Sequence, residues 1–224
     1  MTFSIVARGA DAAYFGIAIA SSSPAVAARC AHVRAGAGAV ATQNITDPAL
    51  GPLILARLAG TQSAEQALKA TLEATPFAAY RQVLAIGPKG PPAVHSGARA
   101  LGLAGTASGE HAAAAGNLLA HADVPAAMLA AFEAARGSLA TRLLAGLAAG
   151  LARGGEAGPV HSAGVLVAHQ VSWPIVDLRV DWSDHDPIAE LQRLWVLYEP
   201  QVDAYVQRAL DPSHAPGFAV PGDP

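Results

Sequence analysis

The sequence predicts an α+β fold, a four-layer α/β/β/α sandwich in which two mainly antiparallel β-sheets lie between helices. Two observations lead to this expectation. Short strand-like segments occur in groups divided by glycine- and proline-rich turns, and pairs of helices stand between the groups. Strict alternation of single strands and helices would instead indicate a parallel sheet. We expect one domain over residues 1–211 and a flexible tail over residues 212–224, which contain four prolines.

The N-terminal segments predict a β-hairpin. Phe3–Ala7 and Tyr14–Ala20 are rich in β-branched and aromatic residues, and the turn-forming residues Arg8–Asp11 lie between them. A third strand is expected at Ala37–Gln43, after an alanine-rich stretch that begins at Pro24.

Two helices are predicted next. Asp47 is suited to be the N-cap of the first, with Pro48 in its first turn and its end at Gly60. Ser63 and Gln66 have the spacing of a capping box for the second, which should end before Pro76.

In the middle of the chain the period of the apolar residues changes, and brief segments are punctuated by glycine and proline. This pattern predicts strands of a second sheet. These strands are expected at Tyr80–Ile86, Ala93–Ser96, Leu101–Thr106 and His111–Gly116. The C-terminal part predicts two helices, two late strands and a final helix capped by Asp186. Their expected ranges are 123–135, 138–152, 160–168, 175–180 and 186 onward.

Composition excludes several classes of function. The formal net charge is −3, and the 14 lysines and arginines are scattered, so nucleic acid is not an expected partner. The single cysteine, Cys30, cannot form an internal disulfide. The chain has no leader-like N-terminus and no apolar run of about 18 residues, so no membrane association is expected. We therefore expect a cytoplasmic protein.

Thr2 is the candidate catalytic residue. If Met1 is removed, Thr2 carries a hydroxyl nucleophile and an α-amine that can act as its general base at neutral pH. A small second residue is also common for reasons of translation and processing alone. Here the first strand begins at once, so Thr2 should be held at a strand end rather than in a frayed tail.

Hairpin geometry predicts which residues lie near Thr2. A turn centred on Arg8–Asp11 brings Thr2 opposite Ala20 or Ser21. The polar runs Ser21–Ser23 and Thr42–Asn44 end the second and third predicted strands. Three strand ends should thus deliver hydroxyls and amides to one region.

Six segments resemble a bacterial domain-of-unknown-function family, number 1028. They are residues 2–8, 21–24, 38–44, 51–52, 116–117 and 176–181, and the similarity runs from Thr2 to about Leu210. That family looks like a member of the N-terminal-nucleophile (Ntn) hydrolase superfamily. The resemblance implies the same four-layer sandwich and amide hydrolysis, with no family-wide substrate. This sequence departs from the superfamily pattern at one point. Many such enzymes hold a lysine or arginine near the nucleophile, whereas the second predicted strand here ends in serines and Arg29 is the nearest basic residue.

On this interpretation Thr2 Oγ attacks an amide or lactam carbonyl, and no metal or organic cofactor is expected. Asn117 is the first candidate for the oxyanion donor and Gln43 the second, although either amide could simply satisfy a turn or strand end. Further substrate-binding candidates are Ser21, Ser23, Arg29, Thr42, Asn44 and Asp177.

Alternative constellations are less specific. Asp177, Arg179 and Asp181 share one face of a strand, which favours an ion-pair network, and Asp184–Asp186 lack a recognised metal-ligand spacing. No nucleotide-binding loop and no Gly-x-Ser-x-Gly turn is present, and Cys30 lies among alanines that favour packing. The competing hypothesis is a catalytically silent protein that binds a metabolite or assembles with a partner. Trp195, Tyr198 and Tyr205 predict self-association, with core burial as the alternative.

Overall fold

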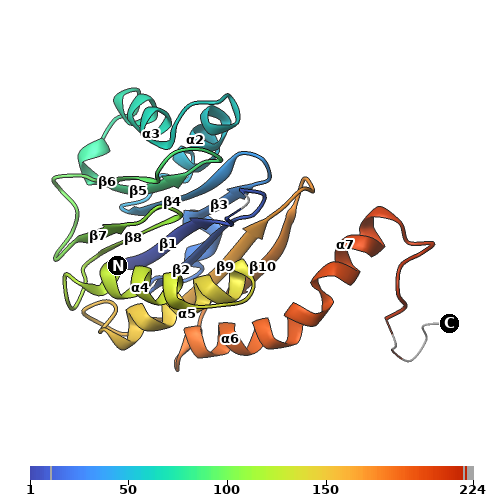
Figure 1. Ribbon diagram of the computed structural model, residues 1–224. Helices are drawn as coiled ribbons and strands as arrows, with labels where there is room; N and C mark the ends of the chain where they lie inside the picture. The colour runs from blue at the N-terminus through green and yellow to red at the C-terminus, as the bar shows by residue number, and fades with distance from the viewer. Residues whose placement is uncertain (11, 219, 221–224) are drawn as a thin grey trace.

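The computed structural model describes residues 1–10, 12–218 and 220, and it places two antiparallel sheets between helices (Figure 1). The six-stranded sheet has the order β10-β9-β2-β1-β8-β7. Its strands are β1 (Thr2–Arg8), β2 (Phe15–Ser21), β7 (Gly105–Ser108), β8 (Ala112–Asn117), β9 (Ser162–Ala168) and β10 (Pro174–Val180). The four-stranded sheet consists of β3 (Ala31–Arg34), β4 (Gly38–Asn44), β5 (Arg81–Ile86) and β6 (Ala93–Ser96).

Helices form the two outer layers, above and below the sheets in Figure 1. The four-stranded sheet is covered by α2 (Leu50–Ala59) and α3 (Ala64–Glu73), and the six-stranded sheet by α4 (Val124–Ala134), α5 (Leu139–Ala152) and α6 (Pro187–Tyr198). The remaining elements are α1 (Val26–Cys30), the 3₁₀ turns η1 (Ala78–Tyr80) and η2 (Glu199–Gln201), and α7 (Val202–Leu210). The α/β/β/α order confirms the predicted fold class.

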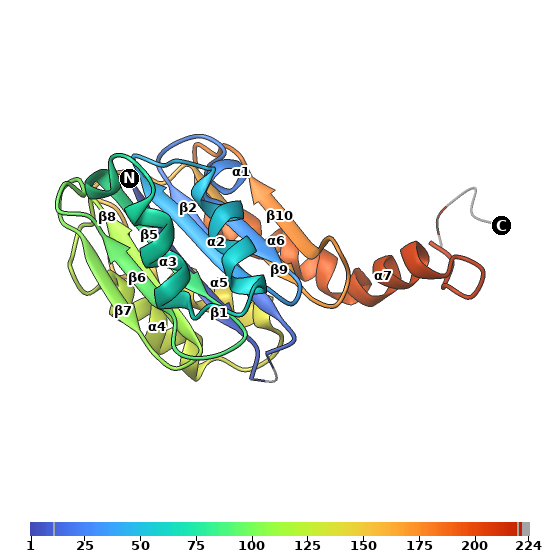
Figure 2. The ribbon, with the colours of Figure 1, turned by 90° about the horizontal axis from the view of Figure 1, so that it is seen from above.

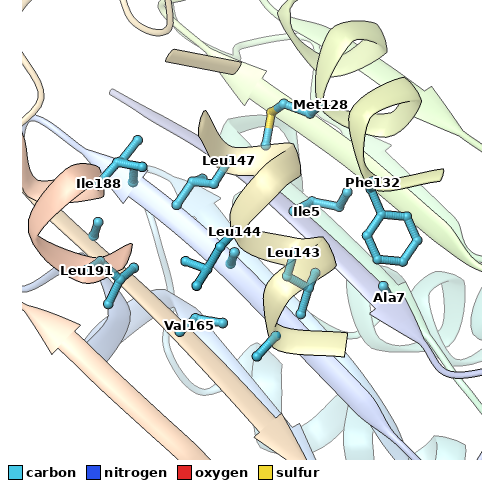
Figure 3. Close-up of a cluster of buried hydrophobic side chains, with 14 of the residues drawn as sticks. Ile5, Ala7, Met128, Phe132, Leu143, Leu144, Leu147, Val165, Ile188 and Leu191 are labelled. Carbon is cyan, nitrogen blue, oxygen red and sulfur yellow. The ribbon is translucent and has the colours of Figure 1, made fainter. Parts of the chain in front are cut away.

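Strand β1 lies between two hydrophobic layers, which explains why all seven of its residues are buried. Phe3, Ile5 and Ala7 pack against α4 and α5, and Figure 3 shows Ile5 and Ala7 among the helix side chains. Val6, on the opposite face, packs against the second sheet. Successive side chains of a strand point to opposite faces, so a central strand in a sandwich is largely apolar on both sides.

Three of the five predicted helix starts carry a side-chain cap in the structure. Ser63 and Gln66 form the reciprocal capping box, and Asp186 Oδ1 accepts from the Ile188 and Ala189 N–H groups. Ser138 Oγ caps α5 through the Thr141 N–H. The prediction that Asp47 is the N-cap of α2 was wrong. Residues 48 and 49 form a turn that Asp47 Oδ1 stabilises through the Ala49 N–H, and the helix begins only at Leu50.

Assignment of strands to sheets was partly wrong. The predicted third strand became β4 of the second sheet, where it pairs with β5, while β7 and β8 joined β1 in the first sheet. The structure also contains β3 and α1 in the stretch that we expected to be merely alanine-rich, and β7 begins at Gly105 rather than Leu101. Local periodicity identifies a strand but carries no information about its partner.

The predicted final helix is divided in two. Pro200 lacks a backbone N–H and lies in η2, where the chain turns before α7 leaves the body of the domain (Figures 1 and 2). Of the predicted turn and tail, Asp11 and residues 219 and 221–224 lie outside the described residues. Among the described tail residues, Pro216 and Gly217 accept hydrogen bonds from Arg208.

Candidate active site

The space between the sheets changes from apolar to polar at the N-terminal end of β1. Deeper in the sandwich this layer is filled by side chains such as Val6, Ile17 and Leu84. At the end it is lined by six buried polar side chains from five strands of the two sheets. They are Thr2, Ser4, Ser21, Gln43, Gln82 and Asn117, which we call the polar cluster. Buried polar groups that are not needed for packing indicate a functional site.

Thr2 stands at the centre of this end. It is 5% exposed, pairs with Asn117 across the β1–β8 ladder, and its Oγ lies 3.4 Å from Ser21 Oγ. Phe3 pairs with Ala20, in agreement with the predicted hairpin register. The hydroxyls of Thr2 and Ser21 both donate to the Met1 carbonyl oxygen. Met1 therefore covers the Thr2 hydroxyl in the unprocessed chain.

Gln82 connects the two sheets. Its Oε1 accepts from Gln43 Nε2 at 2.7 Å and from Asn117 Nδ2 at 3.1 Å. Its Nε2 donates to Ser96 Oγ at 3.1 Å and to the Gly116 carbonyl at 3.0 Å. Our sequence reasoning missed Gln82, and the available signal was one amide directly before the apolar run Val83–Ile86.

The two amides predicted to bind an oxyanion differ in how they are bonded. Gln43 Oε1 accepts from Ser4 Oγ, and its Nε2 donates to both Gln82 Oε1 and the Ala115 carbonyl, so both of its N–H groups have acceptors. Asn117 Nδ2 has one recorded acceptor, and Asn117 Oδ1 has no partner among the described residues. Because an amide nitrogen carries two hydrogens, Asn117 keeps one donor for a ligand.

Glu156 is a second residue that the sequence did not reveal. It is 3% exposed and follows Gly154 and Gly155, whose φ values of +111° and +55° suit glycine. Its Oε1 accepts from the Ser22 N–H at 3.0 Å. Burial raises the pKa of the Glu156 carboxyl, while the N-terminal amine, Ser22 and His161 act in the lowering direction. A buried carboxyl group thus lies within electrostatic range of the chain terminus.

Comparison with known proteins follows from this geometry. The family model described as Family of unknown function (DUF1028) matches residues 2–191. The chain belongs to this family. A crystal structure of a DUF1028 protein from Silicibacter pomeroyi is 30% identical, covers 88% of each chain and has a TM-score of 0.81. The family resemblance inferred from the sequence is confirmed.

Two other solved structures are more distant. BPH from Thiobacillus denitrificans, in complex with epoxomicin, is 17% identical over 75% of this chain and 99% of that chain, with a TM-score of 0.40. Anbu (ancestral β-subunit) from Yersinia bercovieri is 14% identical over 92% and 97%, with a TM-score of 0.39. Both TM-scores are too low to bear on the function of this chain. None of the curated proteins matches it.

The other predicted site residues of this DUF1028 protein lie at varying distances from the cluster. Ser23 adjoins it, because its N–H donates to Ser21 Oγ at 3.0 Å. Thr42 points to the helix side of β4 and bonds Thr46 and the Asp47 carbonyl. Asn44 links two neighbouring loops by donating to the Tyr80 carbonyl and accepting from the Leu101 N–H.

The two charged candidates are engaged elsewhere. Arg29 Nη1 donates to the Pro24 and Ala25 carbonyls at the start of α1. Asp177 forms an ion pair with Arg179 on the edge strand β10, with Nε and Oδ1 2.6 Å apart. The structure therefore groups Thr2, Ser21, Gln43 and Asn117 but not Thr42, Arg29 or Asp177.

A separate hollow of this DUF1028 protein lies at the opposite end of β1 from the polar cluster. It has a volume of about 600 Å³ and is lined by α5 and α6 and by residues such as Tyr14 and Trp195. No residue of the polar cluster lines it. Within residues 1–10, 12–218 and 220, no three His, Cys, Asp or Glu side chains are grouped to hold a metal ion. In the same ranges, every helix is too short or too polar to cross a bilayer.

Proposed function

We propose that this DUF1028 protein is a hydrolase that loses Met1 and uses Thr2 to cleave an amide, a lactam or a related C–N bond of a small metabolite. One observation carries the proposal. The Thr2 hydroxyl lies at the start of a central strand of an α/β/β/α sandwich, within a buried cluster of uncharged polar side chains. A residue fixed by two neighbouring strands is well positioned for covalent catalysis.

The reaction has two steps. Thr2 Oγ attacks the carbonyl carbon while the Thr2 amine, directly or through a water, takes the hydroxyl proton. That proton passes to the leaving nitrogen when the C–N bond breaks, which leaves an ester on Thr2. Water then hydrolyses the ester and restores the hydroxyl. We assign the oxyanion to Asn117 Nδ2, because its second N–H has no recorded acceptor, whereas both N–H groups of Gln43 do.

The chemical character of the cluster suits an uncharged reacting group. Its side chains are hydroxyls and amides, which can orient a carbonyl and an N–H without requiring a charged substrate. The chemistry uses only groups of the chain, so the proposal includes no cofactor. We also propose a cytoplasmic location, because a single cysteine suits a reducing compartment.

Intact-mass analysis of the purified protein tests the proposal. We expect the mass of a chain without Met1 and, after treatment with a β-lactone, one adduct that fragmentation assigns to Thr2. Thr2→Ala should carry no adduct at residue 2. Retention of Met1, or a processed chain that does not react, would contradict the hydrolase proposal.

The competing candidate is a silent binding or assembly protein that keeps Met1. With Met1 in place, the Met1 carbonyl accepts both site hydroxyls and covers the cluster. A protein that keeps Met1 in the cell would have no free Thr2 amine to act as base. The same mass measurement therefore decides between the two candidates.

We also propose that the protein is a homo-oligomer that associates through α6 and α7. Trp195 is buried and Tyr198 stacks on Tyr205 with ring centroids 5.6 Å apart, so these aromatic residues mainly hold the two helices in place. Val196 and Leu197 of α6 are exposed instead. A nine-residue helix such as α7 is marginal on its own in water, which favours a partner.

Light scattering coupled to gel filtration checks the association. We expect an oligomer for the wild-type chain and a monomer for Leu197→Glu, because a charge cannot be buried unpaired in an apolar interface. Lys69→Glu, on the exposed face of α3 and away from α6 and α7, is the control for a change of charge and should stay oligomeric. A monomeric wild-type protein would refute the proposed association.

A further inference from the structure

Glu156 is held rigidly beside the start of β1. Its segment pairs with the residues that continue β8, through hydrogen bonds from the Ala120 N–H to the Gly155 carbonyl at 3.0 Å and from the Ala157 N–H to the Leu118 carbonyl at 2.9 Å. Leu119 and Glu156 form an antiparallel bridge. The same β8 ends at Asn117, the residue that pairs with Thr2. Glu156 is thus fixed to the framework of the site.

The Glu156 carboxylate is only half satisfied. Oε1 accepts from the N–H of Ser22, the residue that follows Ser21 at the end of β2. Oε2 is buried and has no partner among the described residues. A buried carboxylate oxygen without a donor is costly, so its retention indicates a ligand or a group that arrives later.

The groups that can supply this donor are few. The N-terminal amine and the imidazole of His161 both act to lower the pKa of the Glu156 carboxyl, so both lie within electrostatic range of it. His161 Nδ1 lies 2.7 Å from the Ser183 carbonyl, and its ring stacks on Trp182. Burial raises the pKa of the Cys30 thiol, and the N-terminal amine acts on that pKa in the lowering direction. His161 Nδ1 therefore already has an acceptor, which favours the amine as the donor to Oε2.

We propose that the Glu156 carboxylate binds the α-amine of processed Thr2, orients it toward Thr2 Oγ, and stabilises the ammonium formed when that amine accepts the hydroxyl proton. This inference rests on the proposed function. Removal of Met1 moves the chain terminus by one residue, which is about 3.8 Å between Cα atoms. The amine then belongs to Thr2 in β1, and the segments that follow the neighbouring strands β2 and β8 make the contacts that position Glu156. Glu156 acts through the amine and is a positioning residue, not a nucleophile.

The pKa of the Thr2 amine is the decisive quantity. An anion beside an amine favours its protonated form and raises its pKa, so removing the anion lowers that pKa. For Glu156→Gln we expect the amine pKa to fall by about one pH unit. The ascending limb of the β-lactone acylation rate should move by the same amount toward lower pH, and the plateau rate should fall about tenfold because the ammonium loses its partner.

The amine pKa is measured from the pH dependence of acetylation of the N-terminal residue by acetic anhydride, followed by peptide mass analysis. Glu156→Asp should restore most of the shift, because it keeps the charge. Glu110→Gln, which removes a carboxylate whose side chain is 83% exposed, should leave the pKa unchanged. A thermal melt of each variant checks that it is folded.

The outcomes separate the two proposals. An unchanged amine pKa in folded Glu156→Gln overturns the role of Glu156 and leaves the Thr2 proposal standing. A processed chain whose amine pKa shifts as expected, but whose hydroxyl never reacts, overturns the hydrolase proposal alone. Retention of Met1 overturns both.

Discussion

Asn117→Ala is expected to slow the acylation of Thr2 by a β-lactone about 100-fold or more. Loss of one oxyanion donor costs roughly two to three powers of ten in rate, because the donor acts in a site from which water is excluded. The effect on folding should be small, since Gln82 Oε1 keeps its bond from Gln43 Nε2. We expect a loss of about 1 kcal/mol in the free energy of unfolding.

Ser96→Ala is the matched control for this variant. It removes a different hydrogen bond of the same Gln82 side chain, the one to Ser96 Oγ, and so disturbs the network from the side away from Thr2. Its acylation rate should stay within about threefold of the wild type. Equal losses of rate in the two variants would show that the network acts only by rigidity and that Asn117 does not bind the oxyanion. Both rates are measured by mass spectrometry at one pH.

Gly38→Ala is expected to lower the free energy of unfolding by about 3 kcal/mol or more. Gly38 has φ of +148°, a conformation that residues with a side chain rarely adopt. An added Cβ would lie 2.1 Å from the Ile86 carbonyl oxygen of the neighbouring strand. That contact is with backbone, so no rotation of a side chain can relieve it and β4 must separate locally from β5.

Gly36→Ala tests whether the contact or the backbone conformation dominates. Gly36 also has a positive φ, +68°, but an added Cβ would meet no atom within 4 Å. We expect a loss of about 1 kcal/mol, the ordinary cost of the left-handed conformation. Urea titrations followed by circular dichroism measure both variants. Similar midpoints for Gly36→Ala and Gly38→Ala would disprove the steric explanation.

Several features were predictable because they depend on residues close in the chain. The caps at Ser63, Ser138 and Asp186 follow from side chains that reach N–H groups two or three positions away. The first hairpin follows from its turn, and with it the position of Thr2 beside Ser21. The division of the final helix could have been foreseen from Pro200, which cannot continue a helical hydrogen-bond ladder.

The rest of the candidate site required the tertiary structure. Gln82 and Asn117 are 35 positions apart in the sequence and belong to different sheets, so no local pattern could indicate that they are bonded. Glu156 resembled an ordinary charged residue after a helix-ending glycine pair, and only the fold buries it beside Ser22, 134 positions away. Likewise, local sequence could not predict which sheet β4 and β7 join.

The sequence by itself determined the family, the layered fold class and the position of Thr2 at the start of a buried strand, because these depend on local periodicity, short-range turns and motif resemblance. The tertiary structure decided which amides surround Thr2 and which carboxyl group is buried beside Ser22. Their positions depend on pairing between distant strands, where the free energy comes from burying two apolar sheets against each other and from satisfying the few polar groups left between them.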